Sequence, residues 1–217
     1  MRFIGHLDLL KLLRRALARA GAPVAYSAGF NPHQLLSVAL PLPLGMAGLG
    51  ECADVTLTEA ADPDALSVMM VRLNSALPAG VRILRARALA EGDKRAAAAV
   101  CAAVYDIALP LDITAAANGL LNEKEILLIK KTKSGIKEID IRPDILAFSA
   151  VPEGGGTRLS ATLRAGGDRN VKPDLLLAHI AALAAQPLAP YDAQIGRTQL
   201  LQMTEQGLAD LYSAVPF

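Results

Sequence analysis

The chain has 217 residues, of which 53% are hydrophobic and 20% are charged, and its formal net charge is +1. This length suits one large domain or two small ones, and the apolar content excludes an intrinsically disordered chain. No window approaches the roughly 18 uninterrupted apolar residues of a membrane span, and the N-terminus lacks the apolar run of a signal peptide. We therefore expect a cytoplasmic protein, in which the only two cysteines, Cys52 and Cys101, are reduced thiols without a metal.

Charge is unevenly distributed along the first part of the chain. Residues 1–34 contain five basic side chains and one acidic one, whereas residues 51–64 contain five acidic side chains and no basic one. A helical pattern follows Asp8, which is expected to be its N-cap, and ends at Gly21. Projected at about 100° per residue, this helix has an apolar face and an opposite basic stripe. The stripe consists of Lys11, Arg14, Arg15 and Arg19.

The remaining periodicity of the first half predicts the order strand, helix, strand, strand, helix, strand. The elements are a short extended piece at 2–4, the first helix, strands at 36–40 and 52–57, a helix at 62–77 and a strand at 81–86. This is the order of a ferredoxin-like sandwich. Pro41 and Pro43 place the first of the two middle strands at an edge, or take the chain out of the sheet.

The second half repeats that order with additional strands. Its predicted elements are a strand at 105–109, a helix at 112–121, strands at 125–131, 136–141, 146–151 and 158–163, a helix at 174–185 and a strand at 193–201. We therefore predict an α+β protein built from two ferredoxin-like (βαββαβ) sandwiches in tandem. The N-terminal domain is expected at 1–90 and the C-terminal domain, with extra strands, at 91–217. A single mixed α+β domain is the alternative.

The segment at 26–45, YSAGFNPHQLLSVALPLPLG, combines a loop rich in glycine and proline with a strand. Gly29 suits a positive φ, and the dipeptide after Phe30 is typical of a turn. Phe30 is either a plug of the core or a platform on which an unpaired base stacks, and Tyr26 can stack or form a hydrogen bond. His33 has the chemistry for contacting a phosphate or for acid–base catalysis.

This segment and the preceding helix carry a family resemblance. The stretch RFIGHLDLLKLLRRALARAGAPVAYSAGFNPHQLLSVALPLPLG closely resembles the opening of the radical SAM-linked proteins, a bacterial domain family found fused to or beside radical SAM enzymes. The segment at 137–143, KEIDIRP, is similar to a second hallmark of the family, and Arg197-Thr198 is similar to a weaker third one.

Three departures from the family pattern stand in the same region. Gln34 follows the histidine where the family usually has proline, and Gly5 occupies a position where serine is common. The residues that usually precede Arg2 and complete the first strand are missing. We therefore expect the chain to begin inside that strand, through an internal start or a truncation.

The resemblance implies an accessory role in RNA modification or processing, with a tRNA or rRNA and a radical SAM enzyme as partners. Radical SAM chemistry needs three clustered thiolates for its iron–sulfur cluster, which two separated cysteines cannot supply. We therefore expect a non-catalytic RNA-binding adaptor without a cofactor or metal. Its predicted RNA contacts are Lys11, Arg14, Arg15, Arg19, Tyr26, Phe30, Asn31, His33 and Arg142.

Two other functions fit the same residues. In a metal-free RNA endonuclease, His6 and His33 would share a groove, one taking the 2′-OH proton and the other protonating the leaving oxygen. In a protein–protein docking module, the apolar loop would bind the partner enzyme without touching RNA. Plainer interpretations also stand, namely a solvated basic helix face and a pair between Asp140 and Arg142 that only stabilises a turn.

Overall fold

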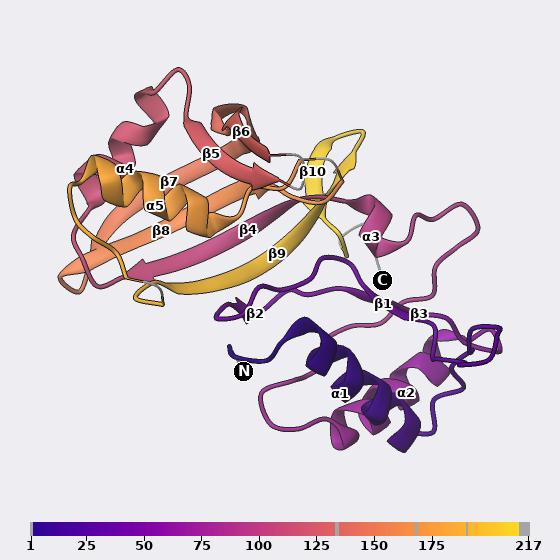
Figure 1. Ribbon diagram of the computed structural model, residues 1–217. Coiled ribbons are helices and arrows are strands. Elements are labelled where there is room, and N and C mark those ends of the chain that lie inside the picture. The colour runs from indigo at the N-terminus through magenta and orange to yellow at the C-terminus, as the bar shows by residue number, and fades with distance from the viewer. Residues whose placement is uncertain (1, 133–134, 168, 190, 213–217) are drawn as a thin grey trace. The chain divides into compact units, whose positions relative to one another are not determined.

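The computed structural model describes residues 2–132, 135–167, 169–189 and 191–212 (Figure 1). Helices and strands are mixed along these residues, so the predicted α+β class is confirmed. The chain forms two compact units, one made of Met1–Gly45 and Cys52–Ala98 and the other of Met46–Glu51 and Ala99–Phe217. The predicted division lies at 90/91, a few residues earlier than the observed one. That either unit is a domain able to fold alone stays a prediction.

The first unit contains two helices and a two-stranded sheet. Its elements are α1 (His6–Arg19), β1 (Leu36–Val38), β3 (Ala53–Val55) and α2 (Pro63–Ala76). β1 and β3 are antiparallel. The start of α2 is the predicted one, because a carboxylate oxygen of Asp62 accepts a hydrogen bond from the Ala65 amide at 2.7 Å and proline occupies the first turn.

The start of α1 differs from the prediction. The helix begins at His6 with Gly5 as its N-cap, and no side chain caps it. Asp8 lies inside the first turn, so its predicted capping role is wrong. Its carboxylate instead lies 3.4 Å from the ammonium of Lys11, one turn further along the helix. An acidic side chain in this position still favours the helix through the macrodipole.

The predicted strand at 81–86 is wrong, since residues 81–90 form neither helix nor strand. The side chain of Asn74, on α2, explains the difference. Its amide donates to the carbonyl of Ile83 at 3.0 Å and accepts from the Ile83 amide at 2.8 Å. A side chain therefore satisfies the backbone groups that a neighbouring strand would otherwise bind. At the start of the chain, Arg2 lies in a turn rather than in the predicted extended piece.

The second unit contains the larger sheet and most of the core. In chain order its elements are β4 (Val100–Leu109), α4 (Thr114–Gly119), η1 (Leu120–Asn122), β5 (Leu127–Thr132), β6 (Gly135–Asp140), η2 (Arg142–Asp144), β7 (Ile145–Glu153), β8 (Gly156–Arg164), α5 (Pro173–Leu183), β9 (Gln194–Thr204) and β10 (Gly207–Asp210). A short helix, α3 (Ala96–Ala99), precedes β4. The sheet order is β10-β9-β4-β8-β7 with antiparallel neighbours, and β5 and β6 form a separate hairpin.

The core of the second unit follows from alternation along its strands. Buried and partly exposed residues alternate over much of β4 and β8, as a half-buried sheet requires. Figure 1 shows α4 and α5 against this sheet. Ile107, Leu159 and Leu163 from the strands and Leu176 and Ile180 from α5 are fully buried. Burial of this apolar surface is the main stabilising contribution to the unit.

A two-residue strand, β2 (Ala47–Gly48), was not predicted, and it belongs to the second unit. It pairs with β9 in parallel, with Gly48 opposite Arg197. Glu51 then binds the guanidinium of Arg197 through both carboxylate oxygens, at 2.8 Å from Nε and 2.5 Å from Nη2. Arg197 is 1% exposed, so this bidentate pair is buried. The segment 46–51 is thus held on the second unit by both backbone and side chain.

The surroundings of Arg197 keep it charged. Burial alone would lower the pKa of Arg197, but its hydrogen bonds and charge interactions with Glu51, together with Tyr105, raise it. Burial raises the pKa of the Tyr105 phenol, and the nearby guanidinium lowers it only in part. At neutral pH the cluster therefore contains a neutral tyrosine and a charged guanidinium.

Glu51→Ala is expected to lower the free energy of unfolding by about 3–5 kcal/mol, because it leaves the buried Arg197 charge without its carboxylate. Urea denaturation followed by far-UV circular dichroism measures this change. The matched control is Glu153→Ala, whose carboxylate binds the partly exposed Arg158 at 3.1 Å and should contribute much less, because solvent screens this pair. Equal losses in the two variants would contradict the importance of the buried pair.

Gly50→Ala is expected to destabilise the protein by about 1–3 kcal/mol, because overpacking forces the backbone to shift. A Cβ at this position would lie 2.1 Å from the carbonyl oxygen of Thr198 on β9. The control is Gly119→Ala in α4, where no atom lies within 4 Å of the added Cβ and helix propensity should add about 0.5–1 kcal/mol. Thermal unfolding should show a lower melting temperature than the wild type for Gly50→Ala and a higher one for Gly119→Ala.

Candidate functional site

The loop that follows α1 is closed by hydrogen bonds between Ser27 and His33. The Ser27 amide donates to the His33 carbonyl at 2.9 Å, and the His33 amide donates to the Ser27 hydroxyl at 3.1 Å. The same hydroxyl lies 2.8 Å from Nδ1 of the His33 ring. Just outside, Tyr26 and Gln34 form an antiparallel bridge. The segment 27–33 is therefore a closed loop on a short two-stranded base, which we call the aromatic loop.

Phe30 stands at the tip of the aromatic loop and is fully exposed, at 105% of its reference area. The alternative in which this ring is a plug of the core is therefore wrong. Gly29 precedes it with φ +113°, a backbone conformation that favours glycine and turns the chain at this point. An exposed phenylalanine forgoes about 1.5–3 kcal/mol of burial energy, so a ring held at a closed tip is suited to an intermolecular contact.

Tyr26 and Asn31 flank the tip. Tyr26 is 56% exposed, and its hydroxyl lies 3.4 Å from the side-chain amide of Gln34, which is buried. Asn31 is exposed. Gln34 directly follows the aromatic loop, and its side-chain amide donates to the Tyr26 hydroxyl at the other side of the loop's base. The loop and its base therefore expose aromatic ring faces together with hydroxyl and amide groups.

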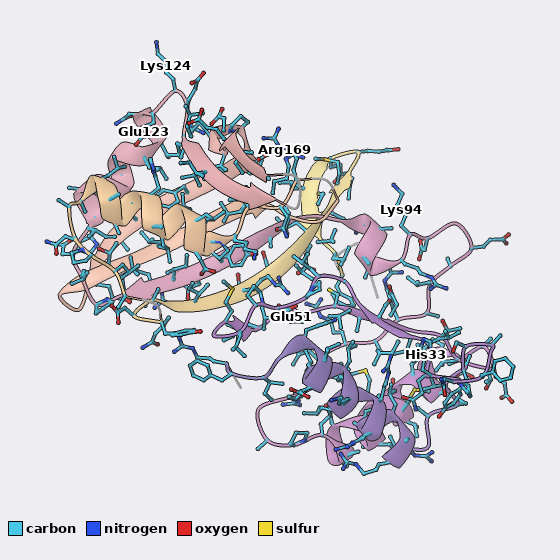
Figure 2. The ribbon with its side chains drawn as sticks, in the orientation of Figure 1. His33, Glu51, Lys94, Glu123, Lys124 and Arg169 are labelled. Atoms are coloured by element: carbon cyan, nitrogen blue, oxygen red, sulfur yellow. The ribbon has the colours of Figure 1, made fainter. Side chains whose placement is uncertain are left out.

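His6 and His33 are not joined by any hydrogen bond among the described residues. His6 is the first residue of α1, and its buried Nδ1 has no hydrogen-bond partner there. His33 is exposed, and Figure 2 places it on the aromatic loop, away from the N-terminal end of α1. The paired-histidine cleavage site therefore receives no geometric support from these contacts.

The four cations of the basic stripe have different surroundings. Arg19 donates to the carbonyl of Ala76 at 2.5 Å and so caps the C-terminal end of α2, where a cation is favourable. Nε of Arg14 is buried without a hydrogen-bond partner in the described residues, and Lys11 is paired with Asp8. Arg15 is exposed. The stripe is thus partly structural, and of its exposed members Arg19 is held by a backbone carbonyl and Lys11 by Asp8.

Arg142 is occupied by backbone carbonyls. Its Nε donates to the carbonyl of Glu123 and its Nη2 to that of Leu121, both at 3.2 Å, which closes the end of η1. Asp140 accepts the amides of Ile126 and Arg142, each at 2.9 Å. These contacts support the interpretation in which Asp140 and Arg142 stabilise a turn. Any RNA contact by Arg142 would have to use its remaining N–H groups.

Sequence reasoning missed the ionic contacts between distant segments. Glu51 and Arg197 are 146 positions apart, and no spacing rule connects them. The same holds for buried Asp144, which binds two arginines of later segments. A third such contact joins α5 to the end of η1, where Nε2 of His179 lies 3.1 Å from a carboxylate oxygen of Glu123. Only a fold that brings the segments together reveals such pairs.

These features define an α+β protein that presents an exposed aromatic loop and a partly structural basic helix. The chain belongs to a family described as "Uncharacterized protein conserved in bacteria (DUF2344)", whose sequence model matches residues 1–173. That match includes α1, the aromatic loop and the turn at Asp140. No curated protein matches the chain. The family description supports a bacterial domain family and does not extend to radical SAM enzymes or RNA.

Two further features bear on partners and ligands. None of the described helices is long and apolar enough to cross a membrane. Among the same residues, no group of three or more histidine, cysteine, aspartate or glutamate side chains is arranged to hold a metal ion. The association with RNA and with a radical SAM enzyme, and a location in the cytoplasm, stay predictions.

Asp140→Asn is expected to destabilise the protein at neutral pH and to reduce the loss of stability in acid. Hydrogen bonds from the Ile126 and Arg142 amides hold the pKa of this carboxyl below its usual value. Its contribution is therefore complete above the unfolded pKa of about 3.9 and is lost as pH falls through the lower, folded pKa.

Urea midpoints measured from pH 7 down to about pH 2 check this prediction, since that range spans the unfolded value. The wild type and Asp140→Asn should converge at the acidic end. Exposed Glu59 provides the control, because Glu59→Gln should run parallel to the wild type. A constant difference between the wild type and Asp140→Asn over the whole range would refute the role of the ionised carboxylate.

Proposed function

We propose that this protein is an RNA-binding accessory protein that presents RNA to a radical SAM RNA-modifying enzyme. The observation that carries the proposal is the fully exposed ring of Phe30 at the tip of a loop closed by Ser27 and His33. Unpaired bases stack on such rings, and each stacked base contributes about 1–3 kcal/mol. The preformed loop lowers the entropic cost of holding the ring in place.

Single-stranded RNA is the form of RNA that suits this loop best. Its bases can be splayed onto aromatic rings, whereas the bases of a helix are already stacked. Tyr26, Asn31 and His33 supply hydroxyl, amide and imidazole groups around the ring, and Lys11 and Arg15 are the cations of α1 most open to phosphates. With a net charge of only +1, we expect few phosphate contacts and a modest salt dependence.

The radical SAM partner is proposed from the sequence resemblance. Because the chain has only two cysteines, it cannot supply the three-thiolate cluster site of such an enzyme. A chain of this family that contributes to radical SAM chemistry would therefore do so by binding the substrate or the enzyme.

We further propose that the two units are ferredoxin-like sandwiches in tandem. In the second unit the strand order β9-β4-β8-β7, with α4 after β4 and α5 after β8, matches the antiparallel βαββαβ arrangement. The hairpin β5–β6 and the strand β10 are additions to it. The first unit retains the order α1, β1, β3, α2, with only two strands paired in its own described sheet.

Protein docking is the second candidate function, and the same exposed ring favours it. A phenylalanine at a loop tip can enter an apolar pocket of a partner, and such anchors dominate many interfaces. Leu44, near the end of the 26–45 segment, is 54% exposed and could extend an apolar contact. The two candidates differ in whether RNA alone binds the isolated protein.

Phe30→Ala is expected to weaken binding of single-stranded RNA by about 5- to 150-fold, the equivalent of one lost stacking contact. It should leave the unfolding midpoint unchanged, because the ring is exposed. Fluorescence anisotropy with unstructured oligoribonucleotides and with tRNA, at several salt concentrations, measures the affinity. Phe3→Ala is the control, since Phe3 is also exposed, at 64%, and lies outside the loop.

Three results would count against the adaptor. A wild type that binds no RNA at about 50 mM salt would remove the RNA role, because electrostatic binding is strong there. If Phe30→Ala then impaired binding to a radical SAM enzyme, protein docking would replace RNA binding as the proposed function of the loop. Cleavage of RNA in chelator, abolished by His33→Ala, would instead establish the endonuclease.

A further inference from the structure

Asp144 is a buried carboxylate that binds two arginines from different segments. It is 4% exposed and lies in η2. Its Oδ1 is 3.3 Å from Nε of Arg164, the last residue of β8. Its Oδ2 is 3.0 Å from Nε and 2.8 Å from Nη2 of Arg169, in the connection to α5. One negative charge therefore holds two positive charges, and this cluster of three side chains has a net charge of +1.

The two guanidinium groups reach the surface although their anchor is buried. The side chain of Arg164 is 42% exposed and that of Arg169 is 55% exposed. Figure 2 shows Arg169 beside β6, consistent with a hydrogen bond at 3.2 Å from its Nη2 to the carbonyl of Asp140. Within the described part of the chain, neither Nη1 forms a hydrogen bond. Each arginine thus keeps N–H groups that can bind an external acceptor.

This arrangement differs from an ordinary surface ion pair. Arg158 lies on the same strand as Arg164 and is 41% exposed, but it binds two acidic side chains, Asp106 and Glu153. That cluster has a net charge of −1, whereas the cluster at Asp144 carries excess positive charge. Its arginines are also fixed by a buried carboxylate, so less side-chain entropy is lost when they bind a ligand.

We propose that Arg164 and Arg169, positioned by Asp144, bind a phosphate group of the RNA backbone. Guanidinium groups match phosphate oxygens in charge and in hydrogen-bond geometry. The inference rests on the proposed RNA-binding function. It proposes a second RNA contact, located in the second unit, besides the one proposed for the aromatic loop in the first unit. Neither arginine belongs to the residues that the sequence singles out.

The test measures RNA affinity against salt for the full chain carrying Arg164→Gln or Arg169→Gln. Each variant should weaken binding by about threefold to tenfold and lower the slope of log K against log salt by about 0.7, the value of one lost phosphate on a single strand. Arg158→Gln is the matched control and should leave both quantities unchanged. Circular dichroism verifies that each variant is folded.

Arg169→Gln removes a partner of the buried carboxylate and can destabilise the fold. Arg164→Gln then carries the test, because Arg169 still binds Asp144 through two nitrogens. Arg169→Lys adds a second check. It keeps the charge and loses the guanidinium fork, so it should retain the salt slope and lose affinity.

The outcomes separate this inference from the proposed function. If RNA binding depends on Phe30 but is unchanged in both glutamine variants, the phosphate site is overturned and the adaptor stands. If the wild type binds no RNA, the phosphate site is tested separately, by measuring whether tripolyphosphate raises the temperature of thermal unfolding. Stabilisation that Arg169→Gln abolishes would support a phosphate site filled by a nucleotide or a free phosphate, and its absence would overturn the site.

Discussion

The buried bond between Glu51 and Arg197 is the constraint on which the arrangement of the chain depends. A guanidinium that is 1% exposed requires a carboxylate, because an unpaired buried charge is far more costly than a buried pair. The carboxylate comes from the segment 46–51, which follows the aromatic loop and β1 in sequence but folds with β9. The segment that directly follows the 26–45 motif therefore belongs to the second unit.

The aromatic loop is stabilised differently, because local hydrogen bonds fix its backbone while the apolar ring that it carries stays in solvent. Ser27 and His33 satisfy each other's backbone and side-chain groups, so the loop needs no burial of Phe30 to keep its shape. His33 is consequently a structural member of the loop as well as one of its exposed polar groups. The hydrogen bonds that close the loop therefore do not involve the Phe30 ring, which stays exposed to solvent.

Local patterns predicted much of the fold, and the failures have physical causes. Asp62-Pro63 marks the start of α2, and alternation identifies β4, β7, β8 and β9, because capping and burial act over a few residues. The segment at 81–86 has a strand pattern, yet the amide of Asn74 replaces the expected strand neighbour. β2 has only two residues and no pattern of its own. Among the site residues, the sequence left open whether Phe30 is exposed. That Arg19 and Arg142 donate to backbone carbonyls at the ends of other helices depends on tertiary contacts, which local patterns do not predict.

The assignment of residues 46–51 to the second unit also has a consequence for synthesis on the ribosome. The chain passes between the two units at 45/46, at 51/52 and at 98/99, and the partner of Glu51 is made 146 residues later. Domains generally fold in the order in which they emerge, and contacts of large sequence separation form late. The segment 46–51, which lies in sequence between the two parts of the first unit, therefore emerges before its partners on β9 have left the exit tunnel. Until then the nascent chain carries an unpaired segment shortly after the aromatic loop that exposes Phe30.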